Sequence, residues 1–225
     1  PPNRLRKKTG IFRRHICGAK EIASDLAIKA VEKIFANGID KSKVEMLLLC
    51  TQSPDYFLPT TACILQYKLG LEKSCGAMDY NLGCSGYIYG LSLAKGMIES
   101  GQVNNVLLVT TETYSKYINE KDHSVKPLFG DGATATFVEA VDTDIPGLDG
   151  FVFGTDGSGF ENLIVPTGGM VHPYGTVNVE EETDEYGNVR TASNIHMKGS
   201  AISDFALEVV PDTVEKILHK THKTK

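Results

Sequence analysis

The 225-residue sequence lacks an apolar run long enough to span a bilayer, and its first residues lack the features of a secretory signal peptide. A transmembrane protein and a secreted protein are therefore both disfavoured. The five cysteines are an odd number and show no spacing typical of a metal site, so we expect no bound metal. Together these absences predict a protein of the reducing cytoplasm with no membrane insertion.

The sequence also lacks an excess of positive charge. Lysine and arginine number 23 against 28 aspartate and glutamate residues, which gives a formal net charge of -5. Such a balance gives no reason to expect a nucleic acid as partner. A basic cluster near the N-terminus is the exception, and it suits either a phosphate or acidic partner or a solvated arm. Its members are Arg4, Arg6, Lys7, Lys8, Arg13 and Arg14.

Strand-like and helix-like segments alternate along the chain, which predicts an α/β fold with a parallel or mixed sheet covered by helices. The length suffices for one large domain or most of two. Long strands are predicted at 44–51, 77–80, 105–112 and 133–141, and short strands around 150–154 and 163–166. Helices are predicted at 21–37, 60–69, from just after Cys84 to 100, and at about 200–219.

The segment DYNLGCSGYIYGLSLA, residues 79–94, places Cys84 in a turn between a predicted strand and a predicted helix. Backbone N–H groups at the start of a helix favour negative charge and therefore stabilise the nucleophilic thiolate form of a cysteine. The helix after Cys84 is apolar or small around much of its circumference, so we expect it to be buried. A nucleophile at the start of a buried helix would be reached through a narrow tunnel, which suits a long, thin substrate.

Three other interpretations of Cys84 remain. It could be a core cysteine, like Cys50 and Cys63, which we expect to be small buried apolar residues. A hydrolase elbow also puts a nucleophile on a strand-to-helix turn, but it needs a glycine two residues before the nucleophile, where Leu82 stands. A thiol redox protein is disfavoured because no second cysteine lies close in sequence.

Five stretches in order along the chain resemble the thiolase superfamily, and within it the 3-oxoacyl-acyl-carrier-protein synthase III enzymes. They are KKTGIFRRHI, FLPTTACILQYKLGL, DYNLGCSGYIYGLSLAKGMIESG, LFGDGATATFVEA and NIHMKGSAISDFALEVV. The resemblance implies a thiolase-like layered αβαβα fold, with the first half nearly complete and the second half truncated. Residues 1–195 would form the N-terminal half that carries Cys84, and residues 196–225 would hold the opening helix of the C-terminal half.

The resemblance further implies an acyltransferase that catalyses a decarboxylative Claisen condensation, with Cys84 attacking an acyl thioester. Acyl-CoA or acyl carrier protein would deliver the acyl group, and malonyl-acyl carrier protein would extend it, in fatty acid or related acyl-chain biosynthesis. No cofactor is implied beyond these substrates. The alternative is a thiolase-fold acyl-binding or interaction module that cannot condense, because the family's His and Asn motifs are not found in residues 1–225.

Substrate contacts are implied at five positions, namely Lys8, Thr9, Leu58, His123 and Ser200. Lys8 and His123 stand where the family has arginines that contact CoA, and Arg4 stands where a tryptophan stacks on adenine. The acyl donor could therefore be carried by a carrier protein instead of CoA. Leu58 stands where a partner subunit's side chain closes the acyl pocket, which implies a homodimer. A core position is the alternative for Leu58, and helix capping is the alternative for Ser200.

Overall fold

The structure is a computed structural model that describes residues 6–7, 9–144 and 147–224. The chain divides into two compact units, each built from segments that are distant in the sequence. Unit 1 comprises Pro1–Arg14, Ser115–Phe129 and Asp149–Lys225, and unit 2 comprises His15–Tyr114 and Gly130–Leu148. The division predicted between residues 195 and 196 concerns the halves of a family fold and stays a prediction.

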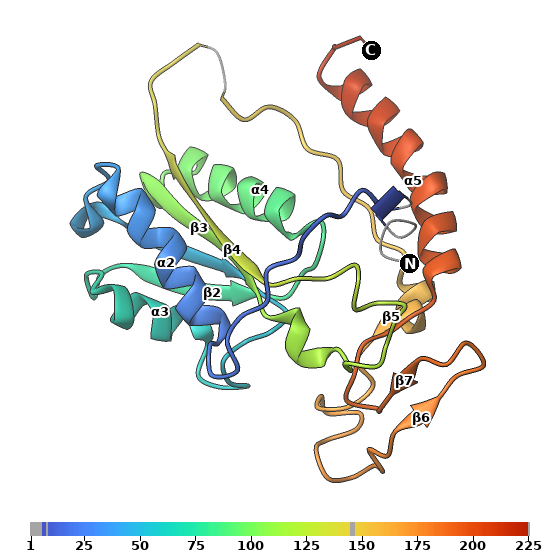
Figure 1. Cartoon of the computed structure of the whole chain (residues 1–225). Coiled ribbons are helices and arrows are strands. Elements are labelled where there is room, and N and C mark those ends of the chain that lie inside the picture. The colour runs from blue at the N-terminus through green and yellow to red at the C-terminus, as the bar shows by residue number, and fades with distance from the viewer. Residues whose placement is uncertain (1–5, 8, 145–146, 225) are drawn as a thin grey trace. The chain divides into compact units, whose positions relative to one another are not determined.

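Unit 2 is an α/β layer, as the alternating segments predict (Figure 1). Its sheet has the strand order β2-β1-β3-β4, in which β1 is parallel to β2 and β3, and β3 is antiparallel to β4. The strands are β1 (Met46–Cys50), β2 (Gly76–Tyr80), β3 (Asn105–Glu112) and β4 (Gly132–Glu139). The helices are α2 (Ala23–Ala36), α3 (Thr61–Leu69) and α4 (Gly86–Glu99), with the 3-10 turn η1 (Lys41–Lys43). All of the long strands and helices predicted here are confirmed, with ends that differ by a few residues.

Two apolar layers, one on each face of the sheet, form the core of unit 2. Leu47 and Leu49 of β1 pack with α2 and α3, whereas Leu48 between them packs with α4. This alternation is the two-residue period of a strand covered on both faces, which explains why β1 is apolar throughout. Strand β3 is built in the same way, because Leu107 belongs to the first layer and Leu108 to the second.

Helix α4 approaches the sheet closely because two of its residues are glycines. A Cβ at Gly86 would lie less than 3.0 Å from the thiol sulfur of Cys50. A Cβ at Gly90 would lie less than 3.0 Å from the Tyr80 hydroxyl oxygen and from the nearer methyl carbon of Leu108. Any larger residue at these two positions would therefore push the helix away from β1, β2 and β3.

Only one side of α4 is buried. Its buried residues are Gly86, Gly90 and Ala94, which face the sheet. Tyr87, Ile88 and Leu93 are exposed. The prediction of a helix buried around its circumference is therefore wrong for the described part of the protein, because apolar composition alone does not provide a second surface to cover the outer side.

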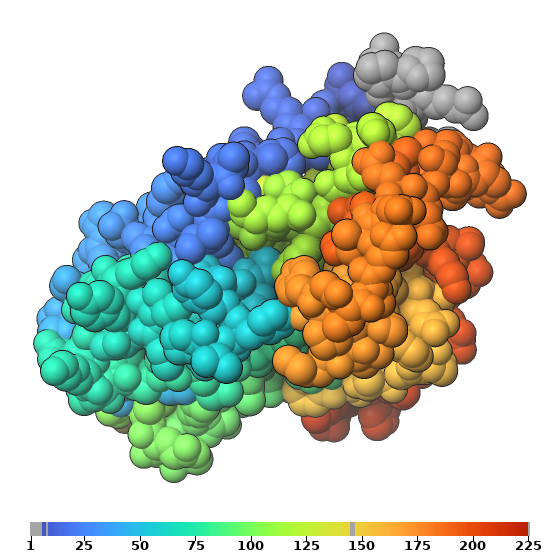
Figure 2. Space-filling view, turned by 90° about the horizontal axis from the view of Figure 1, so that it is seen from below, coloured from blue at the N-terminus to red at the C-terminus, as the bar shows by residue number. Residues whose placement is uncertain are grey.

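Unit 1 contains one long helix and short strands. β5 (Leu163–Ile164) pairs with β8 (His196–Met197), and β6 (Glu182–Thr183) pairs with β7 (Val189–Arg190), both antiparallel. The segment that carries β6 and β7, orange in Figure 2, lies at the surface of this unit. The remaining elements are α5 (Gly199–Lys220) and the 3-10 turns η2 (Tyr114–Tyr117), whose first residue belongs to unit 2, and η3 (Gly157–Asn162).

Two predictions about this unit have different outcomes. The long helix predicted at about 200–219 is confirmed as α5. The strand predicted at 150–154 is wrong, because these residues form no strand in the described part of the chain; the rings of Phe151 and Phe153 stack with their centroids 6.1 Å apart. In the described ranges, every helix is too short or too polar to span a bilayer.

The substitution Gly90→Ala is expected to lower the free energy of unfolding by roughly 1–3 kcal/mol, because the added methyl group would overlap Tyr80 and Leu108. The matched control is Gly96→Ala in the same helix, where a Cβ meets no atom within 4 Å. That control should raise stability by roughly 0.5–1 kcal/mol through helix propensity. Urea unfolding measures both effects, and equal effects of the two substitutions would contradict the close packing of α4.

Candidate active site

Three parallel strands of unit 2 end at the same edge of the sheet, and polar side chains stand at each end. Gln52 and Ser53 follow β1, Cys84 follows β2, and Glu112 closes β3. Strands β2 and β3 lie on opposite sides of β1, so the connection from β1 to β2 and the connection from β2 to β3 run in opposite directions across the sheet. In open α/β sheets this switch point is where loops form a ligand-binding crevice. This edge is therefore the candidate active site.

Cys84 lies in the turn between β2 and α4, and its side chain is exposed. The backbone N–H of Gly86 donates to the Gly83 carbonyl at 2.9 Å and closes the turn around Cys84. Helix α4 then begins at Gly86, two residues after the cysteine. The predicted placement of Cys84 between a strand and a helix is thus confirmed, and its role as a nucleophile stays a prediction.

Two side chains of the sheet, the buried Cys50 and the partly buried Tyr80, hold this turn. The Cys50 thiol donates to the Leu82 carbonyl at 3.1 Å, and the Tyr80 hydroxyl donates to the Gly86 carbonyl at 2.8 Å. Burial raises the pKa of both Cys50 and Tyr80, because desolvation disfavours their charged forms. Both groups therefore remain protonated at neutral pH and act as hydrogen-bond donors to the turn.

A partly buried carboxyl group, Glu112, joins the ends of β1 and β3. Its Oε1 accepts a hydrogen bond from the Gln52 backbone N–H at 2.7 Å, and its Oε2 accepts one from the Ser53 hydroxyl at 2.7 Å. Burial raises the pKa of Glu112 to about 7, and the hydrogen bonds that it accepts offset only part of this effect. At neutral pH, Glu112 is therefore ionised in only part of the molecules.

The side chain of Gln52 connects this edge to the turn of Cys84. The Tyr114 hydroxyl donates to the side-chain oxygen Oε1 of Gln52. A Cβ at Gly83, the residue directly before Cys84, would lie 2.9 Å from the same oxygen. Gly83 thus allows the Gln52 amide to lie against the backbone of the turn.

Glu112, Gln52 and Tyr114 were not predicted from the sequence. None of them belongs to a short motif, and their association depends on two strands that are adjacent in the sheet but about 60 residues apart in the chain, as the 60-residue separation of Gln52 and Glu112 shows. The signal available in the sequence was the position of these residues relative to the predicted strands. Each polar residue comes at or just after the carboxyl end of a buried apolar strand, where sites of α/β sheets usually form.

Leu58 lies in unit 2 together with Cys84, in the loop before α3. Its side chain is 82% exposed, so the alternative of a core leucine is wrong, and its predicted role in closing an acyl pocket stays a prediction. Lys8, which was predicted to contact substrate, and Arg4 lie outside the described residues.

The other predicted substrate contacts belong to unit 1. The Thr9 hydroxyl accepts a hydrogen bond from the backbone N–H of Ile11 at 3.2 Å. Ser200 is exposed and lies inside the first turn of α5, whose N-cap residue is Lys198. Helix capping therefore does not explain Ser200, and its predicted contact with substrate stays a prediction.

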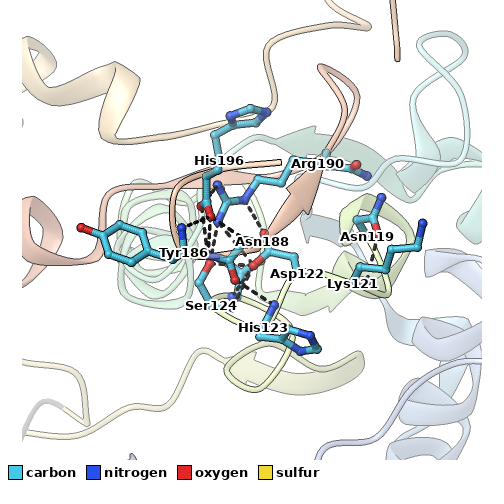
Figure 3. Close-up of polar contacts among 12 residues, drawn as sticks. Asn119, Lys121, Asp122, His123, Ser124, Tyr186, Asn188, Arg190 and His196 are labelled. Atoms are coloured by element: carbon cyan, nitrogen blue, oxygen red, sulfur yellow. Dashed lines mark hydrogen bonds and ion pairs between the residues drawn. The ribbon is translucent and has the colours of Figure 1, made fainter. Parts of the chain in front are cut away.

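His123 lies beside a buried ion pair of unit 1 (Figure 3). Asp122 pairs with Arg190 and accepts a hydrogen bond from the Ser124 hydroxyl at 2.6 Å. Burial by itself would raise the pKa of Asp122, but the hydrogen bonds from Arg190 and Ser124 hold it below its ordinary value. The backbone N–H of His123 donates to the Asn188 side chain at 3.1 Å, which fixes the main chain while the residue stays exposed.

The cysteines divide by burial. Cys50 and Cys75 are buried, Cys17 is intermediate, and Cys63 and Cys84 are exposed. The prediction that Cys50 is buried is confirmed, whereas the prediction for Cys63 is wrong. Cys63 misses the buried stripe of its helix, which consists of Thr61, Ala62, Leu65 and Leu69.

Comparison with known proteins places this geometry in a family. Residues 78–157, which include Cys84 and Glu112, match the family described as 3-oxoacyl-[acyl-carrier-protein (ACP)] synthase III. The crystal structure of a 3-oxoacyl-(acyl-carrier-protein) synthase III is similar with a TM-score of 0.97 and 46% sequence identity, over 100% of this chain and 67% of that chain. A 3-oxoacyl-(acyl-carrier protein) synthase from Burkholderia xenovorans is similar with a TM-score of 0.85 and 36% identity, over 99% of this chain and 62% of that chain.

A relative of known sequence agrees. The beta-ketoacyl-[acyl-carrier-protein] synthase III of Caldanaerobacter subterraneus is 36% identical over 214 residues, which cover 95% of this chain and 61% of that protein. The fold is therefore thiolase-like, as the resemblance predicts. More narrowly, the chain belongs to the 3-oxoacyl-acyl-carrier-protein synthase III family. It spans 60–65% of the length of the curated relatives that it matches.

Glu112 is expected to make stability depend on pH. In the unfolded chain its pKa returns to 4.5, whereas in the folded protein it is about 7. Between these values the folded protein holds a proton that the unfolded chain does not. The stabilisation from this proton is therefore complete below pH 4.5 and is lost as the pH rises through about 7.

Measured against Glu112→Gln, the wild-type protein should lose roughly 2–3 kcal/mol of unfolding free energy between pH 5 and pH 8. Urea unfolding at both pH values gives this difference, and every other titrating group cancels in the comparison. Glu32→Gln, at an exposed position of α2, is the matched control and should show no such change. A pH-independent difference between wild type and Glu112→Gln would contradict the raised pKa.

Proposed function

We propose that the protein is an acyltransferase that condenses an acyl thioester with malonyl-acyl carrier protein through an acyl-Cys84 intermediate. One observation carries this proposal, namely the exposed Cys84 thiol in the strand-to-helix turn of a chain that belongs to the synthase III family. The relatives are named 3-oxoacyl-acyl-carrier-protein synthases, and a 3-oxoacyl-acyl carrier protein is the product of this condensation. The pathway that we infer is fatty acid or related acyl-chain biosynthesis in the cytoplasm.

In the first step, the Cys84 thiolate attacks the carbonyl carbon of the acyl thioester. A carbon–sulfur bond to Cys84 forms, and the thiolate of the carrier leaves. The tetrahedral intermediate carries an oxyanion, which backbone N–H groups at the start of α4, including that of Cys84, would stabilise. A donor preorganised in this way is typically worth about 3 kcal/mol in the transition state.

In the second step, malonyl-acyl carrier protein loses carbon dioxide and becomes an enolate. The enolate carbon attacks the acyl carbonyl on Cys84, a carbon–carbon bond forms, and the bond to the Cys84 sulfur breaks. The products are a 3-oxoacyl-acyl carrier protein and the free thiolate of Cys84. In the resemblance a His and an Asn stabilise the enolate, and we assign these roles to no residue among 1–225.

We infer that a carrier protein, rather than CoA, delivers the acyl group. His123 stands at the position of an arginine that contacts CoA in the family, and it is exposed. An imidazole lacks the fork of donors with which a guanidinium binds a phosphate. Lys8 is a second such replacement in the sequence. Both replacements are expected to weaken binding of the CoA phosphates.

We also infer a homodimer. Strand β2 lies at the edge of the four-stranded sheet, so one row of its backbone groups has no strand partner within the described ranges. The loop after β1 and helix α3, cyan to teal in Figure 2, lie at the surface of unit 2. Large apolar side chains are exposed on β2 and in this loop, namely Met78, Tyr56, Phe57 and Leu58. Exposed apolar groups of this size favour association with a second copy.

The nucleophile is tested by intact mass spectrometry after incubation of the complete gene product with acyl-CoA and, separately, with acyl-acyl carrier protein. We expect one acyl adduct that Cys84→Ser abolishes. Cys63→Ser is the matched control, because Cys63 is also exposed and should not affect the adduct. An adduct that persists in Cys84→Ser would contradict the proposal. Faster transfer from CoA than from the carrier protein would refute the inferred donor and leave the nucleophile in place.

The dimer is tested by light scattering. The wild-type protein should have twice the mass of one chain, and Met78→Lys should shift it towards the monomer because a charge on an edge strand opposes pairing. Met170→Lys, at a position of unit 1 that is 85% exposed, is the matched control and should remain dimeric. A monomeric wild-type protein at micromolar concentration would contradict the homodimer.

A further inference from the structure

One polar network links the carboxyl ends of β1, β2 and β3, and the proposed acyl transfer does not use it. Glu112 on β3 accepts hydrogen bonds from the backbone of Gln52 and the hydroxyl of Ser53, both at 2.7 Å. Ser53 in turn accepts from the backbone N–H of Thr113 at 2.9 Å. The Gln52 side chain connects this network to the turn after β2, because its oxygen lies against Gly83.

In its charged form Glu112 accepts a hydrogen bond at each oxygen, one from the fixed backbone N–H of Gln52 and one from the Ser53 hydroxyl, whose oxygen also accepts the N–H of Thr113. A glutamine at position 112 could still accept from the Gln52 N–H, but its NH2 group would then face the Ser53 oxygen, and the Ser53 hydroxyl proton would have to turn away. The carboxylate therefore accepts from both residues at once, whereas its amide reverses one of the two hydrogen bonds.

Retaining a carboxyl group at this place costs stability. Its pKa of about 7 means that ionisation is disfavoured inside the fold, and an apolar residue would avoid this cost. Groups with perturbed ionisation cluster at functional sites. The position of Glu112 at the edge that carries Cys84 agrees with that expectation.

We propose that Glu112 is a positioning residue for Cys84. It fixes the main chain of Gln52 and Ser53, and the Gln52 side chain, held by Tyr114, then sets the turn that presents the Cys84 thiol to the thioester. This inference rests on the proposed acyl transfer and adds a residue that does not touch the reacting atoms. A thiol displaced by about 1 Å from its attack geometry loses on the order of 100-fold in rate.

The test compares two reactions of the same thiol in the complete gene product. Acylation of Cys84 by an acyl thioester needs an oriented thiol, whereas alkylation by iodoacetamide needs only an accessible one. Peptide mass mapping follows both reactions at Cys84, with Cys63 as an internal reference for reagent activity. The variants are Glu112→Gln and Tyr114→Phe, and the matched controls are Glu32→Gln and Tyr67→Phe at exposed positions.

We expect Glu112→Gln to slow acylation by roughly 10-fold or more and Tyr114→Phe by roughly 3-fold or more, with alkylation changed less than about 2-fold. Both controls should match the wild-type protein in both reactions. Acylation of Glu112→Gln at the wild-type rate would overturn the positioning role and leave the proposed function standing. Equal slowing of acylation and alkylation would also overturn it, because such a change reports general distortion. A wild-type protein that no thioester acylates would instead overturn the proposed function itself, and the positioning role with it.

Discussion

The close approach of helix α4 to the sheet is the constraint on which the rest of unit 2 depends. Gly86 and Gly90 put no side chain between the helix and the strands, so α4 begins directly against Cys50 and Tyr80. The same two side chains then donate hydrogen bonds to the carbonyls of Leu82 and Gly86. Packing and hydrogen bonding therefore fix the same short turn, and this turn carries the exposed Cys84.

Around this turn the protein combines apolar packing with buried polar groups. The leucines of β1 and β3 supply the stabilising core, because they are covered on both faces of the sheet. The polar groups stand at the strand ends, where each strand leaves the core. Glu112 is the costly member, since burial raises its pKa to about 7. The apolar core lies at the centre of the sheet, whereas the polar side chains stand at the edge where open α/β sheets form ligand-binding crevices.

Local patterns were sufficient to predict much of this fold from the sequence. The prediction of a strand at 105–112 matches β3, because an apolar run of this length between polar residues suits a buried strand. The end of α3 was also predictable, since Gly70 adopts the left-handed conformation that favours glycine. The exposure of side chains was harder to predict, because the sequence pattern of a helix does not tell whether another part of the protein covers its outer side. Cys63 and the outer side of α4 demonstrate this. Glu112 could not be found locally, because its partners come from other segments, whereas Thr9, His123 and Ser200 were reached only through a family resemblance.

The central claim is that Cys84 forms a covalent acyl intermediate, and the most direct test is to locate the acyl group on the protein. The complete gene product is mixed with an excess of acyl thioester, quenched in acid and digested, and the peptides are weighed. We expect an acyl group on the peptide that contains Cys84, at most one per chain, with the Cys63 peptide unmodified. An acyl group on another residue, or none from either CoA or carrier-protein thioesters, would contradict it.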